Sequence, residues 1–267
     1  MKTILITGAT DGIGLETAKT LAANGHALLL HGRSSTKLAG AGRDVAAVPG
    51  AGEIETYLGD LSKLSDVVSL ADAVRAQHTS LDVLINNAGV YKTPQPRTES
   101  GLDIRFVVNT IAPYLLTQRL APAMHDDSRV VNVSSAAQAS VNLAALQGRV
   151  RLDDMAAYAQ SKLALVMWTH AMAVARTEGP IMIAVNPGSL LASKMVQEGF
   201  GVAGSDLGIG AACLENAALS DQFADANGKY FDNDVGRFAP LHPDARDASK
   251  CAQLIYAIED IIEAERP

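Results

Sequence analysis

The chain has 267 residues and a formal net charge of −7; 48% of its residues are apolar, 19% charged and 4% aromatic. This acidic balance argues against nucleic acid or an anionic membrane surface as a partner, because there is no basic excess to neutralise phosphates. Two cysteines are too few for a disulfide framework and no apolar stretch reaches the length of a membrane span, so we expect a cytoplasmic protein without a span.

Seven short apolar runs recur at long intervals along the chain. They lack polar alternation, which is typical of strands buried on both faces of a parallel sheet. The runs cover residues 3–7, 27–30, 54–58, 83–86, 130–133, 181–185 and 228–231.

Segments with helical apolar spacing lie between these runs. Alternating strands and helices predict βαβ units, and hence a doubly wound α/β fold of the Rossmann type with about seven parallel strands and helices on both faces. No linker divides the chain, so residues 1–267 are expected to form a single domain. The clearest helical segments are 13–24, 66–77, 102–124, 157–177 and 245–263.

Two stretches are predicted to be irregular. Residues 39–52 are small and flexible, whereas residues 189–210 contain five glycines, a density that opposes a stable helix. We expect 189–210 to close over the site as a mobile lid, and a plain surface excursion is the alternative.

The turn after the first strand has the spacing of a phosphate-binding loop. It reads Gly8-Ala9-Thr10-Asp11-Gly12-Ile13-Gly14 and leads into a helical segment. Glycines let the backbone turn tightly and approach a pyrophosphate, which lies at the helix N-terminus. The turn therefore predicts a dinucleotide site formed by Gly8, Thr10, Asp11, Gly12, Ile13 and Gly14.

The residues after the second strand indicate which dinucleotide is bound. A carboxylate there would bind the ribose 2′-hydroxyl of NAD, but the sequence reads His31-Gly32-Arg33-Ser34. A guanidinium suits a 2′-phosphate, so Arg33 favours NADP over NAD, although Asp11 places a negative charge nearby. The six histidines show no metal-ligand spacing, so no metal is expected, and only His31 is of interest because it lies beside Arg33.

Tyr158 and Lys162 are four residues apart and share one face of a predicted helix. The tyrosine pKa of about 10 is too high for proton exchange at neutral pH, and a neighbouring ammonium lowers it. By itself the pair also fits a solvated helix face, because short motifs arise by accident.

Several further motifs follow one another in a fixed order. They are Asp60, Asn86-Asn87-Ala88-Gly89, Asn109, Asn132-Val133-Ser134-Ser135 and Pro187-Gly188. With the glycine turn and the Tyr158/Lys162 pair, this ordered set resembles the short-chain dehydrogenase/reductase family from residue 7 to about residue 231. The strings Asn132-Val133-Ser134-Ser135, Lys162-Leu163-Ala164 and Gly228-Lys229-Tyr230-Phe231 most resemble the retinol-dehydrogenase-like and WW-domain-oxidoreductase-like subgroup.

The resemblance implies a role for each matching residue. Tyr158 would be the general acid in carbonyl reduction and the base in alcohol oxidation, while Lys162 lowers its pKa and holds the nicotinamide ribose. Ser135 would orient the substrate oxygen, with Ser134 as its rival, and Asn109 would complete a water-linked proton relay. The implied cofactor contacts are Asp60 and Leu61 at the adenine, Asn87, Ala88 and Gly89 along the cofactor wall, and Pro187 and Gly188 near the nicotinamide.

Asn109 also has an argument from the residues themselves. Pro113 follows four residues later and has no N–H, so the Asn109 carbonyl loses its intrahelical donor and the helix is expected to kink. A buried free carbonyl needs a partner, and water is the natural one. A kinked helix without chemistry is the alternative.

Two departures from the family pattern matter. The interval from Ser135 to Tyr158 is longer than is common, and the extra residues 136–157 are expected to shape one wall of the substrate pocket. Ala192 occupies the position of a frequent threonine, with Ser193 beside it as a substitute.

These features predict an NAD(P)-dependent oxidoreductase that transfers a hydride between nicotinamide and a small carbonyl or alcohol substrate, with NADP preferred. The alternative is a non-catalytic dinucleotide-binding sensor or interaction protein, because fold alone does not establish chemistry. The resemblance also implies self-association through residues 102–124 and 157–177.

Overall fold

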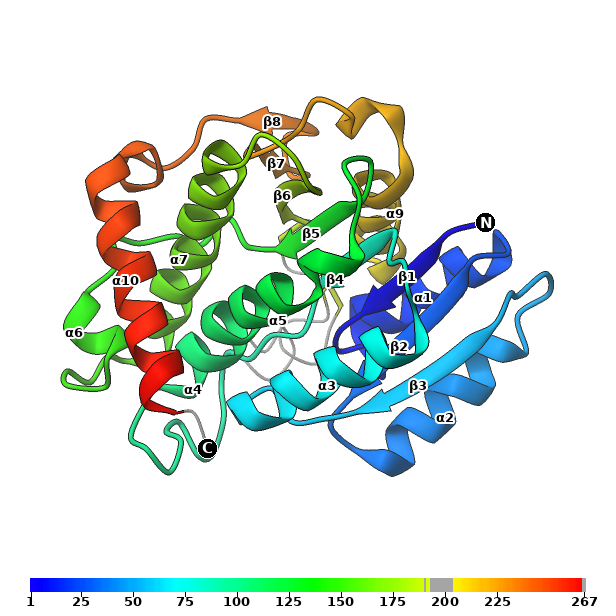
Figure 1. Ribbon diagram of the computed structural model, residues 1–267, viewed down its shortest axis with the longest axis horizontal. Coiled ribbons are helices and arrows are strands. Elements are labelled where there is room, and N and C mark those ends of the chain that lie inside the picture. Colours follow the sequence, from blue (N-terminus) through cyan, green and yellow to red (C-terminus); the bar gives the residue numbers. More distant parts are fainter. Residues whose placement is uncertain (190, 193–203, 266–267) are drawn as a thin grey trace.

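The computed structural model describes residues 1–189, 191–192 and 204–265. Their sheet has eight strands in the order β3-β2-β1-β4-β5-β6-β7-β8, with helices on both faces (Figure 1). Neighbouring strands run parallel from β3 to β7, and β8 is antiparallel to β7. The strands are β1 Thr3–Ile6, β2 Ala27–Gly32, β3 Ile54–Leu58, β4 Val83–Asn86, β5 Arg129–Val133, β6 Ile181–Asn186, β7 Tyr230–Asp232 and β8 Arg237–Ala239.

The predicted Rossmann-type class and its parallel strands are confirmed, and β8 is an addition. The strand is only three residues long, too short for a periodic signal. The helices are α1 Gly12–Ala23, α2 Ser35–Ala46, α3 Leu64–Gln77, α4 Ile104–Phe106, η1 Val107–Ile111, α5 Ala112–Leu120, η2 Ala121–Ala123, α6 Leu143–Leu146, α7 Asp154–Ala175, α9 Leu207–Leu219, η3 Asp221–Phe223, η4 Pro243–Arg246 and α10 Ala248–Ala264.

The sheet has a hydrophobic core on each face. In β1, Leu5 faces the core beneath α3, α5, α7 and α10, whereas Ile4 and Ile6 face the core beneath α1, α2 and α9. All three side chains are fully buried. Burial on both faces explains why the strand sequences lack polar alternation.

The prediction that residues 39–52 are irregular is wrong in its first half, because α2 extends to Ala46. The helix begins at Ser35, directly after Ser34, whose hydroxyl caps it, and it buries Leu38, Ala41 and Val45 along one face. This apolar face provides tertiary packing that outweighs the low helix propensity of the glycines in the segment.

The irregular segment predicted for residues 189–210 ends earlier than expected. Helix α9 begins at Leu207 and includes two of the five glycines. A Cβ atom on Gly210 would lie 2.7 Å from Leu191 Cδ1 and 3.2 Å from Ile13 Cγ2. Gly210 therefore permits close packing of α9 against its neighbours. Residues 190 and 193–203 lie outside the described part of the chain, so the lid stays a prediction.

The C-terminal helix α10 packs against α7 (Figure 1). Leu254 and Ile258 are fully buried, and the Tyr114 hydroxyl of α5 donates a hydrogen bond of 2.8 Å to Glu259. No helix in the described ranges has the length and apolar character needed to cross a membrane.

A buried ion pair joins the loop before α4 to the start of α7. Arg105 is 2% exposed, and its Nε and Nη2 donate to the two carboxylate oxygens of Asp103 at 2.8 and 2.6 Å. Its Nη1 donates to Asp154. Because α4 leads to Asn109 and α7 to Tyr158, this pair sets the spacing of the two helices that hold these residues.

The substitution Arg105→Met is expected to lower the free energy of unfolding by about 3 kcal/mol, because it leaves Asp103 buried without its cation. Adding Asp103→Ser should recover part of the loss, since serine keeps an N-cap acceptor without the charge. Urea unfolding followed by circular dichroism measures both values.

The control is Lys19→Met, which removes an exposed ion pair with Glu16 and should change stability by less than about 0.5 kcal/mol. An Arg105→Met variant as stable as the wild type would contradict the assignment.

Candidate active site

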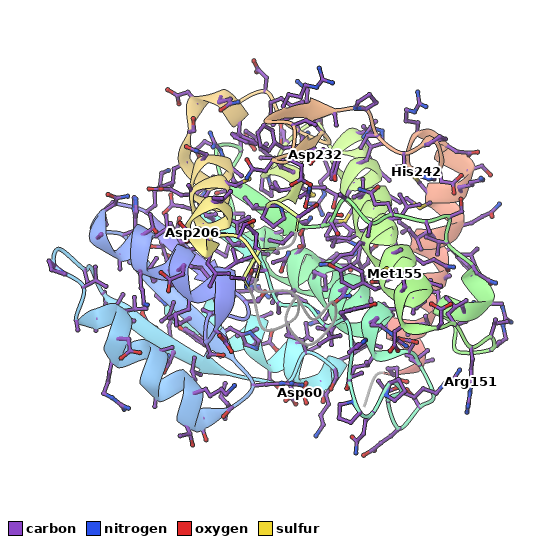
Figure 2. All side chains as sticks on the ribbon, turned by 180° about the vertical axis from the view of Figure 1, so that it is seen from behind. Asp60, Arg151, Met155, Asp206, Asp232 and His242 are labelled. Atoms are coloured by element: carbon purple, nitrogen blue, oxygen red, sulfur yellow. The ribbon has the colours of Figure 1, made fainter. Side chains whose placement is uncertain are left out.

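The site lies where the carboxyl ends of β1, β4, β5 and β6 meet. The strand order reverses between β1 and β4, and such a switch point is where open α/β sheets bind ligands. Figure 2 shows Asp60, which follows β3, and Asp232, in β7, on opposite sides of the molecule with these central strands between them.

The glycines of the turn stand where a side chain would be strained or would collide with neighbouring atoms. Gly8 and Gly12 have positive φ angles of 67° and 54°. A Cβ atom on Gly14 would lie 2.4 Å from both Asn87 Nδ2 and the Gly8 carbonyl oxygen, and one on Gly8 would lie 2.9 Å from Ala88 Cα. Glycine at these positions therefore lets the turn pack directly against the segment that follows β4, which leaves the start of α1 at the end of the sheet where a pyrophosphate would bind.

The ends of β1 and β4 are tied together by hydrogen bonds. Asn87 Nδ2 donates to the carbonyl oxygens of Thr7 at 2.9 Å and Gly8 at 3.1 Å. The amides of Asn87 and Ala88 donate to Thr7 Oγ1 at 3.0 and 3.1 Å. Asn87 and Ala88 thus lie beside the turn, and Thr7 is an additional residue that holds it; their contact with a cofactor stays a prediction.

His31 connects the glycine turn to the end of β3. The Gly8 amide donates to His31 Nδ1 at 3.3 Å, and His31 Nε2 lies 3.0 Å from the Gly59 carbonyl oxygen. Both contacts hold only for the neutral ring with its proton on Nε2. The side chain is 2% exposed, and burial lowers its pKa. His31 is therefore a structural support rather than a ligand.

The residues predicted to recognise the nucleotide follow β2 and β3 or precede α1. Arg33 is exposed, and it has no hydrogen bond or ion pair with the described residues. The Asp11 carboxylate accepts a 2.8 Å hydrogen bond from the Gly12 amide and so caps α1. Asp60 accepts from the Ser62 amide and hydroxyl at 3.0 and 2.8 Å, and Leu61 beside it is buried.

Tyr158, Lys162 and Ser135 are brought together at the ends of β5 and α7. Lys162 Nζ lies 5.7 Å from the centre of the Tyr158 ring and donates to the Val133 carbonyl oxygen at 2.7 Å. The Ser135 side chain lies close enough to Tyr158 for a hydrogen bond between them to act on the tyrosine pKa. This arrangement is the one that the spacing and the resemblance predicted.

Burial shifts the two pKa values in opposite directions. It lowers the pKa of Lys162 to about 8. Burial raises the pKa of Tyr158, and the charge of Tyr91 adds to this, whereas the hydrogen bond with Ser135 opposes it. In the chain alone the tyrosine therefore keeps its proton, and the expected lowering of its pKa by Lys162 does not dominate.

The choice between the two serines is settled by their hydrogen bonds. Ser134 is 3% exposed, and its hydroxyl donates to the Lys162 carbonyl oxygen at 3.1 Å. Ser135 instead reaches Tyr158, and its Oγ also accepts from the Ala137 amide at 3.1 Å. Ser135 is thus the serine that faces the tyrosine.

Asn109 lies in a π turn, η1, where Pro113 predicted a helix irregularity. Its Oδ1 accepts from the Val90 amide at 2.8 Å, and its Nδ2 donates to the Val90 carbonyl at 2.9 Å and to Ser161 Oγ at 3.0 Å. Ser161 precedes Lys162, so Asn109 joins α7 to the segment after β4. The water-linked relay stays a prediction.

Three side chains without a spacing signal complete the site. The Tyr91 ring contacts the Tyr158 ring edge-on with centroids 5.2 Å apart. The Tyr230 hydroxyl and Gln138 Nε2 donate to the Ser135 carbonyl oxygen at 3.1 and 3.0 Å. Gln138 lies in the extra segment 136–157, whose role as a pocket wall stays a prediction. No sequence period could have revealed the contacts of Tyr91 and Tyr230, because they join separate elements.

Pro187 and Gly188 follow β6 beside these residues. Val185 pairs with Val133, and Pro187 and Ser135 each follow two residues after this last pair of the two strands. Gly188 has a φ of 129°, a conformation that side-chain-bearing residues rarely adopt. Ser193, the suggested threonine substitute, lies outside the described residues.

The neutral state of His31 leads to a prediction on pH. Because its pKa is lowered on folding, the unfolded chain binds the proton more readily, and stability is lost as the pH falls below about 6.5. A His31→Gln variant keeps a donor and an acceptor but no titration. Its free energy of unfolding should therefore decline less steeply between pH 7 and pH 5 than that of the wild type.

Denaturant titrations at each pH measure this difference, which a single group limits to about 1.4 kcal/mol per pH unit. His125→Gln replaces an exposed histidine and is the matched control. Parallel slopes for wild type and His31→Gln would show that His31 is not the group responsible.

Comparison with known proteins supports a dehydrogenase. A family model described as short chain dehydrogenase matches residues 2–200. Retinol dehydrogenase 13 of Homo sapiens is 30% identical over 294 aligned residues, which cover 100% of this chain and 86% of that protein. Polyprenol dehydrogenase of Homo sapiens is 34% identical over 195 residues, which cover 69% of this chain and 59% of that protein.

A solved structure shows the same likeness. The short chain dehydrogenase from Burkholderia cenocepacia J2315, in complex with NADP, has a TM-score of 0.70 and 26% identity. The match covers 88% of this chain and 97% of that one.

Proposed function

The chain belongs to the short-chain dehydrogenase family and is an NAD(P)-dependent oxidoreductase; from this premise we propose that it uses NADPH to reduce the carbonyl group of a small molecule, with Tyr158 as the acid. The observation that carries the proposal is the assembly of Tyr158, Ser135 and Lys162 at the switch-point edge of the sheet. A non-catalytic sensor has no need of this assembly.

The residues present fit a dinucleotide. The turn follows a backbone path that would strain a side-chain-bearing residue at Gly8 and Gly12, and Gly14 lets the start of α1 pack directly against Asn87. The first amides of α1, those of Ile13 and Gly14 included, have no intrahelical partners and suit phosphate oxygens. Asp60, Leu61 and Asn87 to Gly89 would hold the adenosine side, and Lys162, Pro187 and Gly188 the nicotinamide side. The bound cofactor would supply the hydride.

The chain's own residues supply orientation and a proton. Ser135 would hydrogen-bond the substrate oxygen and hold it beside the Tyr158 hydroxyl. The raised pKa of Tyr158 keeps the proton on the phenol until the oxygen takes it. The ammonium of Lys162 then stabilises the phenolate that remains. Asn109 would support refilling of the proton through water, as the resemblance implies.

The preference for NADP rests on the end of β2. No carboxylate stands at this position to bind a ribose 2′-hydroxyl. His31, which stands there, is buried and uncharged. Arg33 is exposed beside it without an ion pair in the described ranges, and its guanidinium is free for a 2′-phosphate. The NADP complex of the Burkholderia relative is consistent with this proposal.

The names of the relatives suggest alcohols and their carbonyl forms as substrates, and the aromatic face of Tyr91 beside Tyr158 would accept an apolar carbon skeleton. Cytoplasmic location stays a prediction. So does self-association. Helix α10 packs on one side of α7, and its Glu259 accepts a hydrogen bond from Tyr114 of α5, so this side of the two helices is occupied within the chain.

The Tyr158→Phe variant tests the proton step. It should lower kcat/KM at least about 100-fold, because general acid catalysis is lost, while NADPH binding changes little. NADPH consumption with a panel of aldehydes and ketones measures the first effect, and the fluorescence of bound NADPH the second. Tyr256→Phe on the exposed face of α10 is the control.

Full activity in Tyr158→Phe would refute the mechanism. Tight NADPH binding by the wild type with no turnover across the panel would favour the sensor instead.

The Arg33→Leu variant tests the choice of cofactor. Loss of a charged contact with the 2′-phosphate should raise KM for NADPH by about 10- to 100-fold and leave KM for NADH nearly unchanged. Arg43→Leu, an exposed arginine on α2, is the matched control. Equal changes for the two dinucleotides would show that Arg33 does not read the phosphate.

A further inference from the structure

The turn between β7 and β8 is bonded to the segment that follows β6. The Asn233 amide donates to the Asn186 carbonyl oxygen at 3.0 Å, and Asn233 Nδ2 donates to the Pro187 carbonyl oxygen at 2.9 Å. Asn186 Nδ2 donates to Asp232 Oδ1 at 2.8 Å and to Asp234 Oδ2 at 2.9 Å. Asp232 is labelled near the top of the view in Figure 2.

Asp234 holds Ser189, the residue that follows Gly188. Its Oδ1 accepts from the Ser189 amide at 2.7 Å, and its Oδ2 accepts from the Ser189 hydroxyl. Burial alone would raise its pKa, but the hydrogen bonds from Ser189 and Asn186 together hold the pKa below its usual value. The carboxylate therefore stays charged and able to accept at neutral pH.

The bonded segment borders the reactive groups. Strands β5 and β6 pair as far as Val133 and Val185, and the Ser134 amide donates to the Val185 carbonyl oxygen at 2.7 Å. Ser135 and Pro187 each follow two residues after that last pair. Gly188, between Pro187 and the anchored Ser189, has a φ of 129°. A glycine is conformationally free, so its backbone path depends on the residues that hold it at both sides.

The same hairpin touches the other side of the site. Tyr230 in β7 donates its hydroxyl hydrogen to the Ser135 carbonyl oxygen at 3.1 Å. The hairpin thus contacts both the strand end that carries Ser135 and the turn that faces it. A β-hairpin can form without the hydrogen bonds to Ser135 or those to the segment after β6, so these bonds serve more than the hairpin itself.

We propose that Asp234 is a positioning residue of the hydride-transfer site: through Ser189 and Asn186 it holds the turn beside Ser135, and with it the space that nicotinamide and substrate share. The inference rests on the proposed function. Asp234 is exposed and does not touch the reacting atoms, so it acts through backbone geometry. Displacement of reacting groups by about 1 Å can cost about 100-fold in rate.

The test compares Asp234→Ala and Asp234→Asn with the wild type. Asp234→Ala should lower kcat about tenfold with a smaller change in KM for the carbonyl, because the turn is displaced rather than the substrate pocket lost. Asp234→Asn keeps one acceptor oxygen for the Ser189 amide and should recover part of the rate. Asp225→Asn, an exposed aspartate outside the hairpin, is the control.

Two readouts do not depend on turnover. The fluorescence lifetime of bound NADPH should shorten in Asp234→Ala, because the nicotinamide is held less firmly. The thermal unfolding midpoint of the variant without cofactor should stay within about 2 °C of the wild type, because an exposed side chain contributes little to stability.

The outcomes separate this inference from the proposed function. A wild type that turns over no carbonyl contradicts the proposed function, and the NADPH lifetime still tests Asp234. An Asp234→Ala variant with wild-type kcat and wild-type lifetime overturns the positioning role. Asp234→Ala could also unfold several degrees lower than the wild type and yet have the same kcat and NADPH lifetime as Asp234→Asn. That result would show a purely structural role for Asp234 and would overturn the positioning role as well.

Discussion

The close approach of two backbone segments between β1 and β4 is the constraint on which the site depends. No side chain fits at Gly14, because a Cβ atom would lie 2.4 Å from Asn87 Nδ2 and from the Gly8 carbonyl oxygen. Thr7 and Asn87 bond the two segments together, and His31 bonds the turn to β3. The start of α1 is thereby directed at the switch point, which is the geometry that phosphate binding requires.

The reactive pair depends on burial in a different way. Burial removes the solvent that stabilises a charge, so it favours the uncharged form of both groups. It therefore raises the pKa of Tyr158 and lowers that of Lys162 to about 8. A charge entering the site would therefore change both groups strongly, since little water screens it. The 2.7 Å hydrogen bond to Val133 gives the Lys162 ammonium one fixed acceptor and so sets its place relative to the tyrosine.

Sequence patterns predicted the parts of the molecule that are governed by period and spacing. The buried strands, the glycine turn and the Tyr158/Lys162 pair all follow from local rules, and the structure has them where expected. Helix α2 was missed in part because its stability comes from an apolar face on the sheet, which outweighs two glycines. Tyr91, Tyr230 and Asp234 were missed because their contacts join distant segments, and a single sequence carries no signal for such pairs.

The acidic net charge and the anionic cofactor can be reconciled by distance. Acidic side chains more than about 10 Å away are largely screened at physiological salt, so the local groups decide the binding. At the start of α1 the Asp11 carboxylate caps Gly12 and offsets part of the positive helix end. The glycine turn serves any dinucleotide, whatever its ribose carries. Under the proposed function, discrimination for NADP therefore falls to Arg33, the cation that stands exposed and without an ion pair in the described chain at the end of β2.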